Sequence, residues 1–389
     1  MRGMWMQKAI LTVGGGRGLA RAAVAALLAL VAWLGAAVPC EGAELSPERR
    51  QTVESIRKLT DYADGLNLYT MEVFYEYDLD RLTPVGVDSD QELLDLMLDE
   101  AAPGMGGKVE APEFGCTAFT ATAADGKVYL GRNYDFRDDA SAMMCVCHPK
   151  GGYRSVCFSA LSHLGFKDPF ESEGNRMACL AAPLLPLDGM NEAGVGIAVL
   201  TLPSEPTKQR TGRPTLATPL LIRLVLDRAG STEEAVELIR RYDCYATSGR
   251  DYHFYITDRS GDGRVVEWDC DAEGRPMKVT KIRTITNYFG MYEDRVESGR
   301  KNGKYGLGKE RRDRVEAVLD AAGPAADKAT AWAAAKAAST APDPQSIISN
   351  TQWSVLYGLS DRTHEFVLHR HWDDVFRFED LGATPVGEK

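Results

Sequence analysis

The chain has 389 residues, of which 44% are hydrophobic and 26% are charged. This composition is ordinary for globular proteins and excludes a disordered, collagen-like or small disulfide-stabilised protein. The formal net charge of −11 argues against nucleic acid as a partner, because nucleic-acid-binding surfaces are normally basic. The length allows one or two domains.

Residues 1–43 are predicted to be a signal peptide or an N-terminal anchor. The first 40 residues contain four basic residues and no acidic one, and Ala22–Pro39 is an uncharged run rich in Ala, Leu and Val. A basic start followed by an apolar stretch and small residues is typical of secretory signal peptides. A membrane anchor is the alternative, because the run is just long enough to span a bilayer. We therefore expect a secreted, periplasmic or cell-envelope protein that contacts the membrane only through this segment, if the segment is uncleaved.

Residues 44–115 are predicted to form a helical, acidic segment. They contain 17 acidic and 6 basic residues. Ser46-Pro47 and the capping box Ser89-Asp90-Gln91-Glu92 are helix start signals. The stretch from Pro103 to Gly107 is rich in Gly and predicts a linker, so a boundary is expected just before Cys116.

From Cys116 onward, short strand patterns and turn signals dominate, and Asp125-Gly126 predicts a tight hairpin. The order of strands, then a central helix pair, then strands again favours an α+β fold with antiparallel sheets and segregated helices. Further strands are expected at 143–147, 154–158, 195–200, 253–257, 265–268, 284–287, 354–357 and 365–369, and helices at 219–229, 231–239, 310–321 and 325–338.

The predicted hairpin would bring Arg132 and Asp135 back to the level of Cys116. A nearby cation lowers the pKa of a thiol, and a carboxylate can hold a guanidinium in place. No histidine is close in sequence to act as a base. If the peptide bond before Cys116 were cut, the freed α-amino group could take that part. A buried, purely structural cysteine is the alternative at this point.

The segments Cys116-Thr117-Ala118-Phe119 and Gly131–Phe136 resemble the N-terminal nucleophile (Ntn) hydrolases of the choloylglycine hydrolase, or linear amide C–N hydrolase, family, which includes penicillin V acylase and acid ceramidase. Met190–Ala198 and Ile285–Asn287 resemble later segments of the same family. The resemblance implies a four-layer αββα sandwich over residues 116–389, preceded by a helical propeptide at 44–115. It implies no cofactor and no metal.

The resemblance also implies the roles of individual residues. Cys116 would be the nucleophile, released as an N-terminus by cleavage after Gly115, and Arg132 and Asp135 would position and tune it. Asn287 would donate a hydrogen bond to the oxyanion, and Arg311 would support the network.

Two positions are less clear from the resemblance. Arg312 and Arg314 compete with Arg311 for the later arginine of the family. Thr201 stands where relatives carry asparagine or tyrosine, and its backbone N–H is the group expected at the oxyanion.

The implied function is that of an exported, self-activating amidase that cleaves a small N-acyl amide through a thioester. Two alternatives stay open, namely an acyltransferase that uses the same acyl-enzyme and a non-catalytic secreted binding protein. Export would allow disulfides among the cysteines at 145, 147, 157, 179, 244 and 270. We expect the thiols of Cys145 and Cys147 to point to opposite faces of a strand and therefore predict no metal site there. His369 and His371 are expected to be a surface pair.

Overall fold

A computed structural model of the chain describes residues 45–84, 89–103, 114–136, 139–247, 249–300, 303–343, 345–346 and 349–386. The predicted signal peptide or anchor and most of the linker before Cys116 lie outside these residues. Within the described ranges, none of the helices combines the length and the apolar character that crossing a membrane requires.

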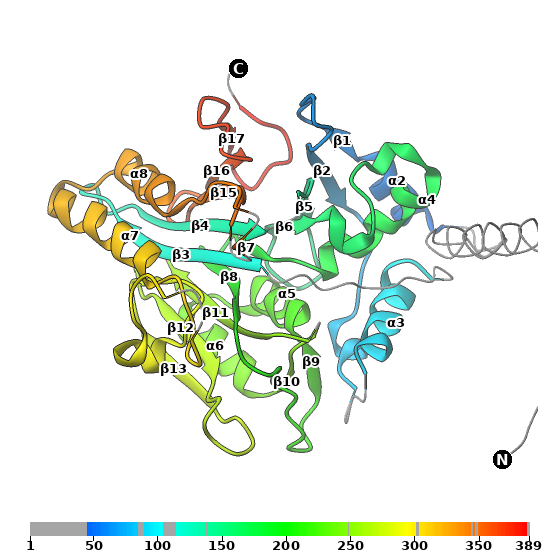
Figure 1. Ribbon diagram of the computed structural model, residues 1–389. Helices are drawn as coiled ribbons and strands as arrows, with labels where there is room; N and C mark the ends of the chain where they lie inside the picture. The colour runs from blue at the N-terminus through cyan, green and yellow to red at the C-terminus, as the bar shows by residue number, and fades with distance from the viewer. Residues whose placement is uncertain are drawn as a thin grey trace, which may run out of the picture. The chain divides into compact units, whose positions relative to one another are not determined.

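Two large sheets form the body of the protein (Figure 1). Strands within each sheet pair antiparallel, apart from one parallel pair, β2 with β5. In strand order, the larger sheet contains β1 (Arg57–Lys58), β2 (Leu68–Val73), β5 (Ala142–Cys147), β6 (Ser155–Ala160), β7 (Asp188–Asn191), β8 (Val195–Leu202), β11 (Asp251–Asp258), β12 (Arg264–Trp268) and β13 (Met277–Lys281).

The smaller sheet carries the residues around Cys116. In strand order it contains β14 (Thr284–Ile285), β3 (Phe114–Thr122), β4 (Val128–Phe136), β15 (Thr351–Gly358), β16 (Thr363–Leu368) and β17 (Phe376–Phe378). A separate parallel pair is made by β9 (Thr215–Ala217) and β10 (Asp243–Tyr245).

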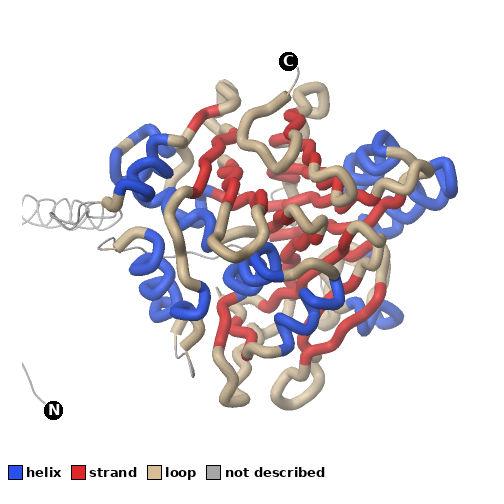
Figure 2. Tube along the Cα trace, turned by 180° about the vertical axis from the view of Figure 1, so that it is seen from behind, coloured by secondary structure: helices blue, strands red, loops and turns tan. Residues whose placement is uncertain are grey.

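Helices cover the outer faces of the sheets, and Figure 2 shows them outside the strands from behind. On the smaller sheet lie α7 (Lys309–Ala322) and α8 (Lys328–Ala338), and on the larger sheet α5 (Thr218–Arg228) and α6 (Thr232–Arg240). The predicted αββα layering is therefore confirmed. The other helices are α2 (Pro47–Glu54), α3 (Asp90–Ala101), α4 (Glu173–Ala178) and the 3-10 helices η1 (Leu79–Leu82), η2 (Leu161–Leu164), η3 (Pro169–Glu171), η4 (Cys179–Leu184), η5 (Gly290–Arg295) and η6 (Gly323–Ala325).

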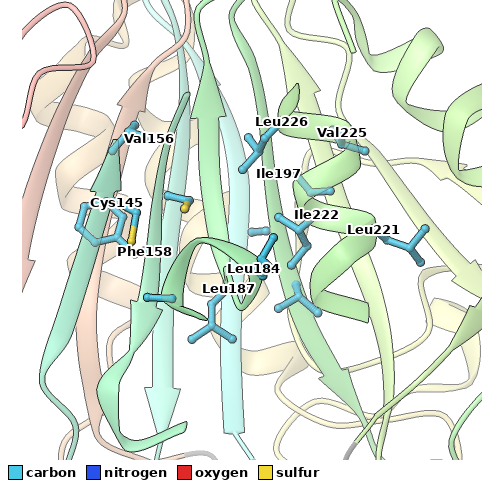
Figure 3. Packing of buried hydrophobic residues seen from close by; sticks show 14 of the residues in the cluster. Cys145, Val156, Phe158, Leu184, Leu187, Ile197, Leu221, Ile222, Val225 and Leu226 are labelled. Atoms are coloured by element: carbon cyan, nitrogen blue, oxygen red, sulfur yellow. The ribbon is translucent and has the colours of Figure 1, made fainter. Parts of the chain in front are cut away.

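Apolar packing joins α5 to the larger sheet. Figure 3 shows Ile222 and Leu226 of α5 in the same buried cluster as Ile197 of β8 and Leu187. These side chains are all fully buried or nearly so, with at most 5% exposure. Their removal from water is the main free-energy gain that holds this layer on the sheet.

The segment before Cys116 contains strands as well as the predicted helices. Ser46 caps α2 and Ser89 caps α3, as the helix start signals predict. Strand β2, however, pairs in parallel with β5, and Leu68 and Met71 on it are fully buried. The prediction of a largely helical segment was incomplete. Strand β2 is an inner strand of the larger sheet and is buried on both faces, so its sequence does not show the alternation of polar and apolar residues that indicates a strand.

The prediction for Cys145 and Cys147 was wrong. Residues two positions apart on a strand share a face, and Arg223 Nη1 lies 3.3 Å from Cys147 Sγ and 3.6 Å from Cys157 Sγ. Cys145 is the cross-strand partner of Cys157, so the three thiols lie on one face. In the part of the chain that the structure describes, every cysteine is a free thiol.

Candidate active site

The β3–β4 hairpin places the predicted residues around Cys116. Gly126 turns the chain with φ of +83°, a conformation that glycine adopts without steric cost. The register pairs Cys116 with Tyr134 and Ala118 with Arg132. Cross-strand partners share a face, so Arg132 lies on the same face as the thiol. Asp135, three residues further on, lies on the opposite face of the sheet.

The thiol of Cys116 is completely buried between the two sheets. Burial raises its pKa to about 11, while the neighbouring Arg132 guanidinium opposes that rise. Arg132 is itself fully buried and donates to the carbonyl oxygens of Asn133 at 2.6 Å and Val199 at 2.8 Å. In this state the cysteine is a neutral thiol beside a fixed cation.

Asp188 is a buried partner of Arg132 that the sequence interpretation missed. Its Oδ2 lies 3.5 Å from Arg132 Nε and accepts a hydrogen bond from Trp353 Nε1 at 3.3 Å, while Oδ1 accepts from the Tyr357 hydroxyl. Burial raises the pKa of Asp188, and the Arg132 charge opposes that rise. The available signal was its position, because Asp188-Gly189 comes directly before the family-like segment at Met190.

Two side chains hydrogen-bond to the backbone of Cys116. The backbone nitrogen donates to Asn287 Oδ1 at 2.7 Å, and Arg311 Nη1 donates to the carbonyl oxygen at 2.8 Å. Asn287 follows β14 at the edge of the smaller sheet, and Arg311 lies in the first turn of α7. Both are buried.

Arg311 also joins Asp135 to this network. Its Nη1 lies 2.8 Å from Asp135 Oδ2, and the Thr351 hydroxyl donates to Asp135 Oδ1 at 2.6 Å. Burial raises the pKa of Asp135, and Arg311 is the main opposing charge. The carboxylate therefore holds Arg311 rather than Arg132, because Asp135 faces the helix layer and Arg132 faces the other sheet.

The geometry separates the three competing arginines. Arg311 is 1% exposed and contacts the site, whereas Arg312 pairs with Glu293 and Asp313 at the surface. Arg314 is exposed. The structure thus brings Arg311, and neither of the other two, to Cys116.

The amide of Asn287 has a defined orientation. Its Oδ1 faces Arg311 Nη2, which can only donate, so Nδ2 is on the other side and donates to Thr201 O at 2.9 Å and to Thr201 Oγ1 at 3.1 Å. Val199 lies on β8, two residues before Thr201. Its N–H donates to the carbonyl oxygen of Leu187, on the side of β8 that faces away from β11. Backbone groups two residues apart point the same way, so the Thr201 N–H is directed out of the edge that meets Asn287.

His163 contacts the cross-strand partner of Cys116. Its Nε2 lies 3.3 Å from the Tyr134 hydroxyl, and burial lowers its pKa to about 4. The Tyr134 ring stacks on Trp353 with centroids 4.2 Å apart. Among the described residues, no group of three or more metal-binding side chains is close enough to hold an ion.

Comparison with known proteins gives a family match for the part of the chain that begins at Cys116. Residues 116–287 match the family described as "Linear amide C-N hydrolases, choloylglycine hydrolase family", so the match begins at Cys116 and ends at Asn287. Over these residues, which make up less than half of the chain, it is similar to a family of hydrolases that act on linear, non-peptide C–N amide bonds. Among curated protein sequences, none matches it.

Two solved structures share the Ntn hydrolase fold with this chain. Penicillin V acylase from Agrobacterium tumefaciens is 19% identical with a TM-score of 0.51, and the alignment covers 68% of this chain and 86% of the acylase. A mutant of the conjugated bile acid hydrolase from Clostridium perfringens is 16% identical with a TM-score of 0.50, and the alignment covers 68% of this chain and 92% of the hydrolase. At this identity the likeness establishes the fold.

Proposed function

We propose that the protein is an exported, self-activating amidase whose nucleophile is Cys116, released as an N-terminus by cleavage of the Gly115–Cys116 bond. The observation that carries this proposal is the convergence of four buried groups on one cysteine. Asn287 and Arg311 bind its backbone, Arg132 lies beside its thiol, and Asp135 holds Arg311.

The first step of activation is an N-to-S acyl shift. The Cys116 sulfur attacks the Gly115 carbonyl carbon, the C–N bond breaks, and the α-amine of Cys116 takes up the thiol proton. Water then hydrolyses the Gly115 thioester and restores the thiol. In the uncleaved chain the Cys116 nitrogen donates to Asn287 Oδ1 at 2.7 Å. After cleavage the same nitrogen, as the α-amine, would stay beside this oxygen. An acceptor at that position orients the amine so that its lone pair is left for the thiol proton.

Hydrolysis of an amide substrate repeats this chemistry. The thiol loses its proton to the α-amine and attacks the substrate carbonyl, the leaving amine takes the proton, and water releases the acyl group from the thioester. The oxyanion would be bound by Asn287 Nδ2 and the Thr201 N–H. Asn287 Nδ2 must first give up a hydrogen bond to Thr201, which a charged oxyanion can replace with a stronger one.

The segment before Cys116 is proposed to stay bound after cleavage as a second chain. Strand β2 pairs with β5 along six residues, Asn67 N donates to Ser141 Oγ at 3.0 Å, and the Tyr77 hydroxyl lies 3.1 Å from Asp227. Loss of this segment would expose an inner strand of the larger sheet and the side chains packed on it. Cleavage therefore frees the nucleophile without dismantling the fold.

The test is to incubate the purified protein with a small thiol-reactive probe, such as iodoacetamide, and locate the modified residue by peptide mapping. The cleaved enzyme should be labelled at Cys116 with matching loss of amidase activity, while Cys244, another buried cysteine, serves as the unlabelled internal control. Full activity after complete labelling of Cys116 would exclude it as the nucleophile.

A further inference from the structure

His253 and Glu267 form a buried pair that no step of the proposed mechanism uses. His253 lies on β11 and Glu267 on β12, and both side chains are completely buried. His253 Nε2 lies 3.0 Å from the carbonyl oxygen of Thr286. Because a carbonyl oxygen only accepts, Nε2 carries a hydrogen and donates it. Thr286 is the residue directly before Asn287, so this bond holds the backbone beside the proposed oxyanion donor.

Glu267 holds the same segment on the other side of Asn287. Its Oε2 accepts from the N–H of Gly290 at 2.9 Å, and its Oε1 accepts from the N–H of Met291 at 2.7 Å. The same carboxylate lies 3.6 Å from His253 Nδ1. Two backbone donors give this buried charge the hydrogen bonds that it needs. The segment 286–291 is therefore attached to the larger sheet on both sides of Asn287.

The attachment defines the distance between the two proposed oxyanion donors. Asn287 reaches across to Thr201 on β8, and β8 pairs with β11 so that Thr201 lies opposite Tyr252 and Leu200 lies opposite His253. One pair of strands thus carries both Thr201 and the histidine that holds the backbone of Asn287. A change at His253 would move Asn287 relative to Thr201 while leaving both residues present.

Thr286 extends the same connection to Arg311. Its hydroxyl donates to the carbonyl oxygen of Gly308 at 2.8 Å, at the start of α7. Gly308 has φ of +87°, and a Cβ atom there would lie 2.5 Å from Arg311 Nη2. The helix start and the arginine are therefore packed directly on Thr286, which His253 holds.

We propose that His253 and Glu267 are positioning residues for the amidase reaction, acting through Thr286 and the 290–291 backbone to hold Asn287 at the oxyanion. This inference rests on the proposed function, because it assigns the oxyanion to Asn287. We therefore expect the reaction to depend on the hydrogen bond that His253 donates, and not on the volume of its side chain.

The test compares His253→Gln, His253→Leu and Glu267→Gln in the cleaved enzyme. Glutamine keeps an N–H donor able to reach Thr286, whereas leucine fills the space without one. With the N-acyl 4-nitroanilide that the wild type hydrolyses fastest, His253→Leu should lower kcat about tenfold or more with KM within about threefold, and His253→Gln should recover most of kcat. Glu267→Gln should lower kcat in the same way. His364→Gln is the matched control, because His364 is a fully buried histidine that contacts Met144 and Phe378.

Asn287→Ala, measured alongside, separates the two ideas. If Asn287→Ala keeps the wild-type kcat, the proposed function fails. If Asn287→Ala loses kcat and His253→Leu keeps it, only the positioning inference is overturned. Equal loss in His253→Gln and His253→Leu would also overturn it. If His253→Leu does not fold, the comparison is made with His253→Asn, whose amide is one methylene too short to reach Thr286 and should lose the kcat that glutamine keeps.

Discussion

Arg311 Nη2 lies 2.6 Å from Asn287 Oδ1, and this contact determines which way the Asn287 amide points. A guanidinium offers donors only, so the amide oxygen must face it and the amide nitrogen must face Thr201. The same arginine reaches the Cys116 carbonyl and the Asp135 carboxylate. One side chain from α7 therefore connects the cysteine, the carboxylate and the proposed oxyanion donor.

Arg311→Lys should abolish self-cleavage or slow it about a hundredfold or more. A lysine ammonium is a single point of donation and cannot replace a planar guanidinium that bonds Cys116 O, Thr117 Oγ1, Asp135 and Asn287 at once. Cleavage is followed by the appearance of the fragment beginning at Cys116 on denaturing gels. Arg312→Lys is the matched control, since its side chain is at the surface, and it should cleave at the wild-type rate. Wild-type cleavage by Arg311→Lys would show that self-cleavage does not need the contacts of the Arg311 guanidinium.

Asp188→Asn should lower kcat/KM and destabilise the fold together. The change leaves the buried Arg132 charge without its carboxylate, and breaking a buried ion pair by removing one partner typically costs about 3–5 kcal/mol. Tyr357→Phe removes one hydrogen bond to Asp188 and keeps the charge, so its cost should be nearer ~1 kcal/mol. Urea unfolding and amidase kinetics of the two variants test whether Asp188→Asn has the larger effect. A larger effect for Tyr357→Phe would mean that Asp188 does not act through Arg132.

The fragment that ends at Gly115 should remain bound to the fragment that begins at Cys116. On size-exclusion chromatography in native buffer the two should elute together, and in denaturing gels they should separate. The buried β2–β5 pairing and the Arg228–Asp80 ion pair at 3.0 Å are the reason. Elution of active enzyme without the first fragment would contradict the proposed two-chain form.

His364 should make the fold less stable in mild acid. Burial lowers its pKa to about 3, well below the value of about 6.5 in an unfolded chain. Between about pH 3 and about pH 6.5, His364 binds a proton in the unfolded chain but not in the folded protein. The free energy of unfolding therefore has its full value above about pH 6.5 and decreases as the pH falls below it. This amounts to roughly 1.5 kcal/mol between about pH 6.5 and about pH 5.

The measurement is urea unfolding of the wild type and His364→Phe at both pH values. Between about pH 6.5 and about pH 5, the free energy of unfolding of His364→Phe should fall by roughly 1.5 kcal/mol less than that of the wild type. An identical pH dependence for His364→Phe and the wild type would show that His364 does not titrate on unfolding.

The helices and the hairpin could be predicted from local sequence because their signals are local. The sequence Ser231-Thr232-Glu233-Glu234 is also a capping-box pattern, and Ser231 caps α6. The Glu234 carboxylate, however, accepts from Gly230 N rather than from the capping residue. The Asp125-Gly126 turn likewise sets the register that brings Arg132 beside Cys116.

Contacts between distant segments could not be predicted in this way. The pairing of β2 with β5 joins distant segments within one sheet, the contact of Asp188 with Arg132 depends on how the two sheets stack, and the partner of Asp135 comes from helix α7. Strand β16 ends at Leu368 rather than at the predicted His369, because His369 and Arg370 both take positive φ in a tight turn. The resemblance left Arg311, Arg312 and Arg314 as alternatives, and Arg311 is distinguished by its burial and by its contacts with the site.

The most direct test of Cys116 as the self-released nucleophile is the intact mass and N-terminal sequence of the purified wild type and of Cys116→Ala. We expect the wild type to yield a fragment whose first residue is Cys116, Cys116→Ala to stay uncleaved, and Cys244→Ala to cleave like the wild type. A wild-type chain that is active while Gly115 and Cys116 remain joined would contradict the central claim, as would cleavage of Cys116→Ala at the same bond.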